Sequence, residues 1–210
     1  MKTCENCNSE ITDNQVYCNN CGHKNNPSLL DTHVSFIVDI GNGLKIPTNP
    51  ITFDHCYNIG AQAMVDKDYY EALEYFNYAI TFKEVNMVKL SQIYCDLGII
   101  YRLAVKDFEK SFDYFELSIS ADSKNQAAYV NTMSLMNHTD DLKGALEVFK
   151  NMLSVINISE IDPRTLHLAG IVCENLRNFE GAKKFYELAI QKGFTEAQSD
   201  LNDVLRKINK

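Results

Sequence analysis

The sequence lacks a long apolar run. Its longest candidate for a membrane segment, Ser35–Ile40, is interrupted by Asp39 and is far shorter than the roughly 20 residues that a membrane-spanning helix needs. The first ten residues, MKTCENCNSE, also lack the apolar stretch of a secretory signal. We therefore expect a cytoplasmic protein with no membrane segment.

Blocks of basic residues are absent as well. The chain has 20 Lys and Arg against 28 Asp and Glu, which gives a formal net charge of -8. Attraction to phosphates supplies most non-specific affinity for nucleic acids, so an acidic chain starts at a disadvantage there. We expect protein or peptide partners rather than nucleic acid.

Motifs of catalysis are missing too. The sequence contains no glycine-rich phosphate loop, no HExxH and no GxSxG. Cys56, Cys95 and Cys173 have no adjacent general base, and their places on predicted helices favour buried thiols over nucleophiles. His138 and His167 fit surface or groove positions better than catalytic ones. We expect that the protein is not an enzyme.

What the sequence does contain is a repeat that begins with residues 53–82. Small or slim residues recur at Gly60, Gly98, Met133 and Gly170, which are 38, 35 and 37 residues apart. Downstream of each, three residues follow at helical spacing, four residues and then three. These triplets are Ala72, Phe76, Ala79; Ser111, Phe115, Ser118; Ala145, Phe149, Met152; and Ala182, Tyr186, Ala189. Such a period is typical of stacked helical hairpins.

These residues resemble the tetratricopeptide repeat family, with one residue inserted in the second unit. The matching first-helix residues are Cys56, Ile59, Gly60, Ala63; Tyr94, Leu97, Gly98, Tyr101; Tyr129, Thr132, Met133, Met136; and Leu166, Ala169, Gly170, Cys173. The resemblance implies a mainly α fold, a right-handed α-α superhelix of about four helix-turn-helix repeats over residues 53–210. A C-terminal helix over residues 195–208 is expected to cap it.

The resemblance also implies a concave groove built from the first helix of each pair. The family's groove positions fall on Tyr57, Asn58, Met64, Cys95, Asp96, Arg102, Val130, Asn131, His138, His167, Ile171 and Glu174. Only Arg102 is basic in this predicted groove, so the acidic tail of a chaperone is not the expected ligand. The polar and aromatic groups suit a peptide backbone and apolar side chains. The alternative is that several of these residues only pack between hairpins.

Residues 1–26 carry two CxxC pairs, and their pattern resembles a bacterial zinc ribbon. Cys4, Cys7, Cys18 and Cys21 are expected to bind one structural Zn2+, because four thiolates fill the coordination shell. We expect a short hairpin between Glu10-Ile11 and Val16-Tyr17. Disulfides and a redox-active pair are the alternatives, but the sequence shows neither a route to an oxidising compartment nor a thioredoxin-like pattern.

Residues 27–52 are predicted to link the two parts. Pro27, Pro47 and Pro50 interrupt this stretch, and residues 41–43 form a turn signal. Residues 36–38 and 44–46 on either side allow a small hairpin, and an irregular connector is the alternative.

Taken together, these features predict an adaptor or scaffold that binds a protein or peptide in the repeat groove, with the zinc ribbon as an accessory contact. The alternative is a regulatory protein that contacts nucleic acid, or the transcription or translation machinery, through the ribbon. The sequence sets no oligomeric state.

Overall fold

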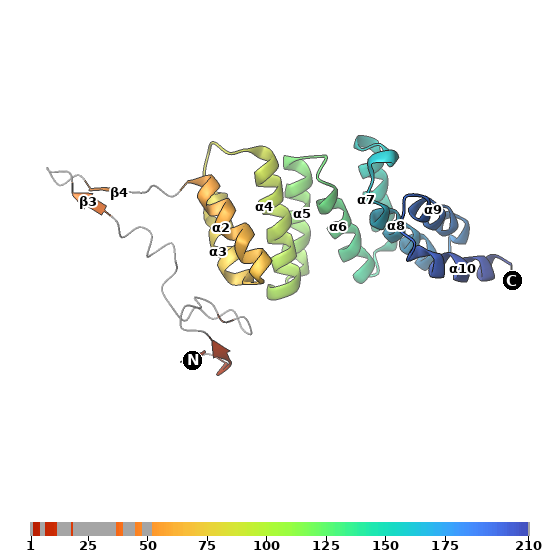
Figure 1. The fold of residues 1–210 in the computed structure, drawn as a ribbon, viewed down its shortest axis with the longest axis horizontal. Helices are drawn as coiled ribbons and strands as arrows, with labels where there is room; N and C mark the ends of the chain where they lie inside the picture. The colour runs from red at the N-terminus through yellow and green to blue at the C-terminus, as the bar shows by residue number, and fades with distance from the viewer. Residues whose placement is uncertain are drawn as a thin grey trace. The chain divides into compact units, whose positions relative to one another are not determined.

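The computed structural model describes residues 2–4, 7–11, 18, 37–39, 45–47 and 52–209. This part of the chain is mainly helical and contains nine α-helices in a repeat arrangement (Figure 1). They are α2 (Phe53–Asp66), α3 (Tyr69–Ala79), α4 (Met87–Ile100), α5 (Phe108–Ala121), α6 (Gln126–His138), α7 (Leu142–Val155), α8 (Pro163–Asn175), α9 (Phe179–Gln191) and α10 (Ala197–Ile208). The chain forms two compact units, Met1–Ser111 and Phe112–Lys210.

Polar side chains define where most of these helices begin. An Asp, Asn or Thr precedes each helix from α2 to α9 and accepts a hydrogen bond from an N–H of the first turn, which satisfies a donor that the helix itself cannot pair. These capping residues are Thr52, Asp68, Asn86, Asp107, Asn125, Asp141, Asp162 and Asn178. Asp162 is followed by Pro163, which suits the first turn of α8 because this position has no intrahelical partner for an N–H.

The turn inside each hairpin recurs four times. A non-glycine residue in the left-handed conformation ends the first helix and is followed by the cap of the second; these residues are Lys67, Lys106, Asp140 and Arg177. In three turns the N–H of the capping residue bonds a carbonyl five residues earlier, as in a Schellman motif. In the second turn Asp107 instead bonds Tyr101, six residues earlier, at 2.9 Å.

That wider turn accommodates the residue inserted in the second repeat. A π-helical turn, η1 (Tyr101–Val105), continues α4 at this place. A π-turn lets a helix hold one extra residue without changing the segments on either side. Ser111 therefore still reaches the carbonyl of Gly98, its repeat partner, at 2.8 Å.

Small residues in the first helices make room for aromatic rings of the second helices. A methyl group at Gly60 would overlap the ring of Phe76, and one at Gly170 would overlap Tyr186. The ring thus fills the space inside its own hairpin. At the same position in the third repeat Met133 is fully buried.

Helix α10 packs on the last hairpin. Its buried residues Ala197, Leu201 and Val204 join the apolar core of the second unit together with Tyr186 and Ala189. The helix begins at Ala197, two residues after the predicted start, because Thr195 forms a turn in which its carbonyl accepts from the N–H of Gln198 at 3.0 Å. It packs on the last hairpin, as expected for the predicted capping helix.

Two short strand pairs lie before the helices. Strand β1 (Lys2–Thr3) pairs antiparallel with β2 (Glu10–Ile11). The predicted hairpin partner of Glu10-Ile11, Val16-Tyr17, lies outside the described residues. Strand β3 (Ile37–Asp39) pairs with β4 (Lys45–Pro47), which is the hairpin alternative for the linker. None of the helices in the described segments has the length and apolarity needed to cross a membrane.

Candidate functional site

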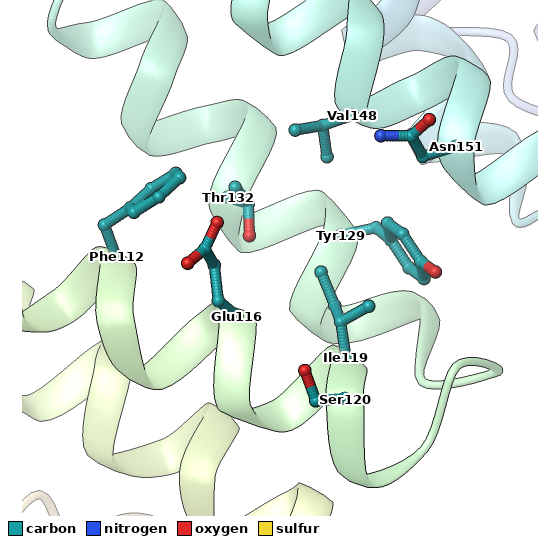
Figure 2. A pocket seen from close by; sticks show the side chains of 8 residues that line it. All are labelled: Phe112, Glu116, Ile119, Ser120, Tyr129, Thr132, Val148 and Asn151. Atoms are coloured by element: carbon teal, nitrogen blue, oxygen red, sulfur yellow. The ribbon is translucent and has the colours of Figure 1, made fainter.

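A pocket of about 340 Å³ lies on α5, α6 and α7, within the second unit (Figure 2). We call it the α5–α7 pocket. Its lining residues are Phe112, Glu116, Ile119 and Ser120 from α5, Tyr129 and Thr132 from α6, and Val148 and Asn151 from α7. None of the residues predicted for the groove lines it.

The floor of the pocket consists of two buried α6 residues whose polar atoms are already bonded. The Tyr129 hydroxyl donates to the carbonyl of Ser123 at 3.2 Å, and the Thr132 hydroxyl donates to the carbonyl of Ala128 at 2.8 Å. Burial, with a smaller contribution from the charge of Asp122, raises the pKa of Tyr129. The floor is therefore neutral.

Glu116 is the charged residue of the lining. Figure 2 shows its carboxylate directed from α5 into the pocket, toward Thr132. Among the described residues this carboxylate has no ion pair and no hydrogen bond. Sequence reasoning missed the pocket. A weak signal was present, because Phe112 and Ile119 directly follow Ser111 and Ser118, two residues of the repeat triplets. They therefore add apolar surface beside these small residues.

Two residues predicted for the groove are instead bonded to the rest of the last repeat and to α10. His167 Nε2 lies 2.6 Å from Asp200 Oδ2. Glu174 accepts from the Tyr186 hydroxyl at 2.8 Å and from Lys207 Nζ at 2.6 Å. We call these five residues the α10 corner. Both residues are half-buried, and their polar atoms, which were predicted to face a partner, are bonded within the last repeat and to α10.

The groove assignment of Cys95 is corrected, because this side chain is fully buried in α4. The neighbouring Asp96 is only partly exposed and accepts from Gln92 Nε2 at 3.2 Å. Burial raises the pKa of Asp96 to about 6, and the hydrogen bond from Gln92 partly offsets this. In α2, Tyr57 lies under Lys89 Nζ, 5.3 Å from the ring centre.

The other groove predictions fall on residues that are at least partly accessible. Asn58 and His138 are exposed. Met64, Arg102, Val130, Asn131 and Ile171 are half-buried. Asn131 donates to the carbonyl of Ala127 at 2.9 Å, which uses one of its two amide hydrogens within α6. The twelve predicted residues therefore differ in exposure, from fully buried Cys95 to exposed Asn58 and His138.

Three of the four predicted zinc ligands lie together. The sulfur atoms of Cys4, Cys7 and Cys18 are all within 4.8 Å of one another, and Cys21 lies outside the described residues. Cys4 and Cys18 are buried. The Cys4–Cys7 loop is closed by a hydrogen bond from the Asn8 N–H to the Cys4 carbonyl at 2.9 Å, with Asn8 in the left-handed conformation.

Cys56 and Cys173 have the surroundings of structural thiols. Cys56 and Cys173 are buried on first helices, as predicted, and burial raises the pKa of Cys56 to about 11 and also that of Cys173. A thiol with a raised pKa is a poor nucleophile near neutral pH.

Comparison with known proteins agrees with the repeat pattern. Residues 91–125 and 163–191 match the tetratricopeptide repeat family. A double mutant of MamA RS-1 superposes with a TM-score of 0.61 at 14% identity, covering 75% of this chain and 85% of that one. A tetratricopeptide repeat protein from Parabacteroides merdae gives 0.59 at 18% identity, covering 77% and 62%.

MamA from Desulfovibrio magneticus RS-1, from residue 41 to its end, gives a TM-score of 0.55 at 14% identity, covering 75% of this chain and 91% of that one. No curated protein matches the sequence. Two segments of the chain therefore match the tetratricopeptide repeat family, and the fold is shared with these proteins.

Proposed function

We propose that this protein is a non-catalytic adaptor whose repeats hold a protein or peptide partner. Tetratricopeptide repeats stack helices into surfaces that bind extended or helical segments of other proteins. The observation that carries the proposal is the α5–α7 pocket, which combines an apolar lining with a carboxylate that has no partner within the described residues. The half-buried first-helix residues of α2 and α4 offer a second surface.

Affinity capture with the full chain tests this proposal. A captured protein is purified and its affinity for the chain is measured by calorimetry. Asn151→Trp places a large side chain at the exposed rim of the pocket and is expected to weaken binding about tenfold or more. Ser154→Trp, also exposed on α7 but outside the lining, is the matched control. Failure to find any direct binder would overturn the proposal.

We also propose that the N-terminal segment binds one structural zinc ion. The donor set fits this metal, because Cys4, Cys7 and Cys18 would supply three thiolates and Cys21 the fourth. A zinc ion held by four thiolates ties a small segment together and has no free position for a substrate. In the adaptor, this segment is an accessory contact.

Elemental analysis of the reduced full chain tests the metal. The expected content is about one zinc per chain, set by a single four-cysteine site. Cys4→Ser or Cys18→Ser is expected to lose most of it, whereas Cys173→Ala, a change in a thiol buried in α8, keeps it. A reduced, folded chain without zinc would contradict the assignment.

A further inference from the structure

We propose that the α5–α7 pocket takes a peptide segment in which an apolar side chain lies next to a lysine or arginine. This inference rests on the adaptor function and specifies the chemistry of the partner. It commits to a basic, apolar segment of another protein and excludes an acidic one.

The apolar half of this preference comes from the lining. Phe112, Ile119 and Val148 face the pocket around the buried floor of Tyr129 and Thr132 (Figure 2). A volume of about 340 Å³ is at the lower end of the roughly 300–1,000 Å³ found for binding pockets. It suits one or two anchoring side chains of a segment that continues over the surface.

The basic half comes from the charges. Glu116 supplies the only charge of the lining, and the other polar residues there, Ser120, Thr132 and Asn151, are neutral. Lys150, next to Asn151 in the chain, is already paired with Glu147 at 3.2 Å. Asp122 adds a second negative charge near the Tyr129 end of the pocket.

These charges favour a cation from the partner. An apolar segment that covered the pocket without one would remove water from the Glu116 carboxylate and leave it unpaired, which costs free energy. An acidic segment would in addition be repelled. A lysine or arginine beside the apolar anchor avoids both costs and adds a charge-assisted hydrogen bond.

Selection from a random library of short peptides displayed on phage tests the inference with the full chain as bait. Peptides that combine an apolar residue with a nearby Lys or Arg are expected to be enriched. A synthetic copy of the strongest peptide is then expected to bind Glu116→Lys about tenfold more weakly, because repulsion replaces attraction. Selection on Glu116→Lys is expected to enrich acidic peptides instead.

The charge-matched control is Glu187→Lys, an exposed position on α9 outside the lining, which should leave affinity unchanged. Asn151→Trp should block the same peptide. If peptides bind but show no basic preference, or if Glu116→Lys and Glu187→Lys act alike, the inference fails and the adaptor function stands. If neither selection nor affinity capture yields a direct binder, the adaptor function itself fails.

Discussion

The α10 corner and the α5–α7 pocket belong to the same unit, yet their acidic residues have different surroundings. In the corner, Glu174 is bonded to Tyr186 and Lys207, and His167 to Asp200. In the pocket, Glu116 has no such partner in the described chain. The difference arises because α10 packs on the last hairpin and brings its own charged side chains to α8.

Under the proposed function, this contrast distinguishes a surface that the fold uses from one left for a partner. Where the chain supplies a covering helix, the polar groups of the first helix become part of the folded structure and contribute to its stability. Where it supplies none, the same kinds of residue remain accessible. Substitutions in the corner should therefore lower stability, and substitutions in the pocket should lower binding.

The largest expected effect comes from loosening α10. Leu201 is 8% exposed and packs in the apolar core of the second unit. Leu201→Ala is expected to lower the free energy of unfolding by about 2 kcal/mol, at the low end for a buried leucine because the site lies near the surface. A urea titration of the full chain measures this.

Leu117→Ala is the matched control, since Leu117 is 46% exposed on α5 beside Glu116. Its expected cost is below about 0.5 kcal/mol, as for most surface substitutions. If both substitutions lowered the free energy of unfolding equally, packing of α10 would add no more to stability than an exposed helix face does. The contrast between the α10 corner and the α5–α7 pocket would then fail.

Much of the fold follows from local sequence. The recurrence of Gly60, Gly98 and Gly170 with their downstream aromatic residues predicts the hairpins, and capping residues such as Asp68 predict where helices begin. Both signals lie within one hairpin, so spacing alone reveals them. The turn signal was present too: a charged residue followed by Asp or Asn, as in Lys106-Asp107, recurs once per repeat.

The candidate site was harder to predict because it depends on packing between hairpins. His167 and Asp200 are 33 residues apart, and nothing in either segment indicates that α10 turns Asp200 toward α8. Cys95 was placed in the groove from its position along the helix. Neighbouring residues of a helix point in different directions, so an error of one residue exchanges a groove position for a core position. The pocket needs side chains from three helices, so no single periodic pattern marks it.

Asp96 on α4 is an intermediate case that sharpens the contrast, since it is largely buried but bonded only to neutral Gln92 within the described chain. Burial raises its folded-state pKa from 3.8 to about 6. Between about pH 4 and 6 the folded chain binds this proton more tightly than the unfolded chain, so the contribution of Asp96 to stability falls as pH rises through that window.

Asp96→Asn should remove the loss of stability that ionisation of the buried Asp96 carboxyl causes above about pH 4. At pH 7.5 the variant is expected to be more stable than the parent by about 1–2 kcal/mol, with the gain vanishing near pH 4. Urea titrations across this range measure it, with Asp113→Asn at an exposed position of α5 as the control. A gain that did not depend on pH would show that the Asp96 carboxylate is not the cause.

The smallest expected effect tests the contrast most directly, because the same substitution, Glu to Gln, is made in the α10 corner and in the α5–α7 pocket. Glu174→Gln removes the charge that Lys207 contacts and is expected to cost about 0.5–1 kcal/mol, since Lys207 is 46% exposed and solvent screens the pair. Glu116→Gln removes a charge without a partner in the described chain and should change stability by less than about 0.3 kcal/mol.

A double-mutant cycle with Lys207→Met separates the contribution of the Glu174–Lys207 pair from other effects, because only the Glu174 substitution should couple to Lys207→Met. If Glu116→Gln is as costly as Glu174→Gln, the Glu116 carboxylate already serves the fold and is not reserved for a partner.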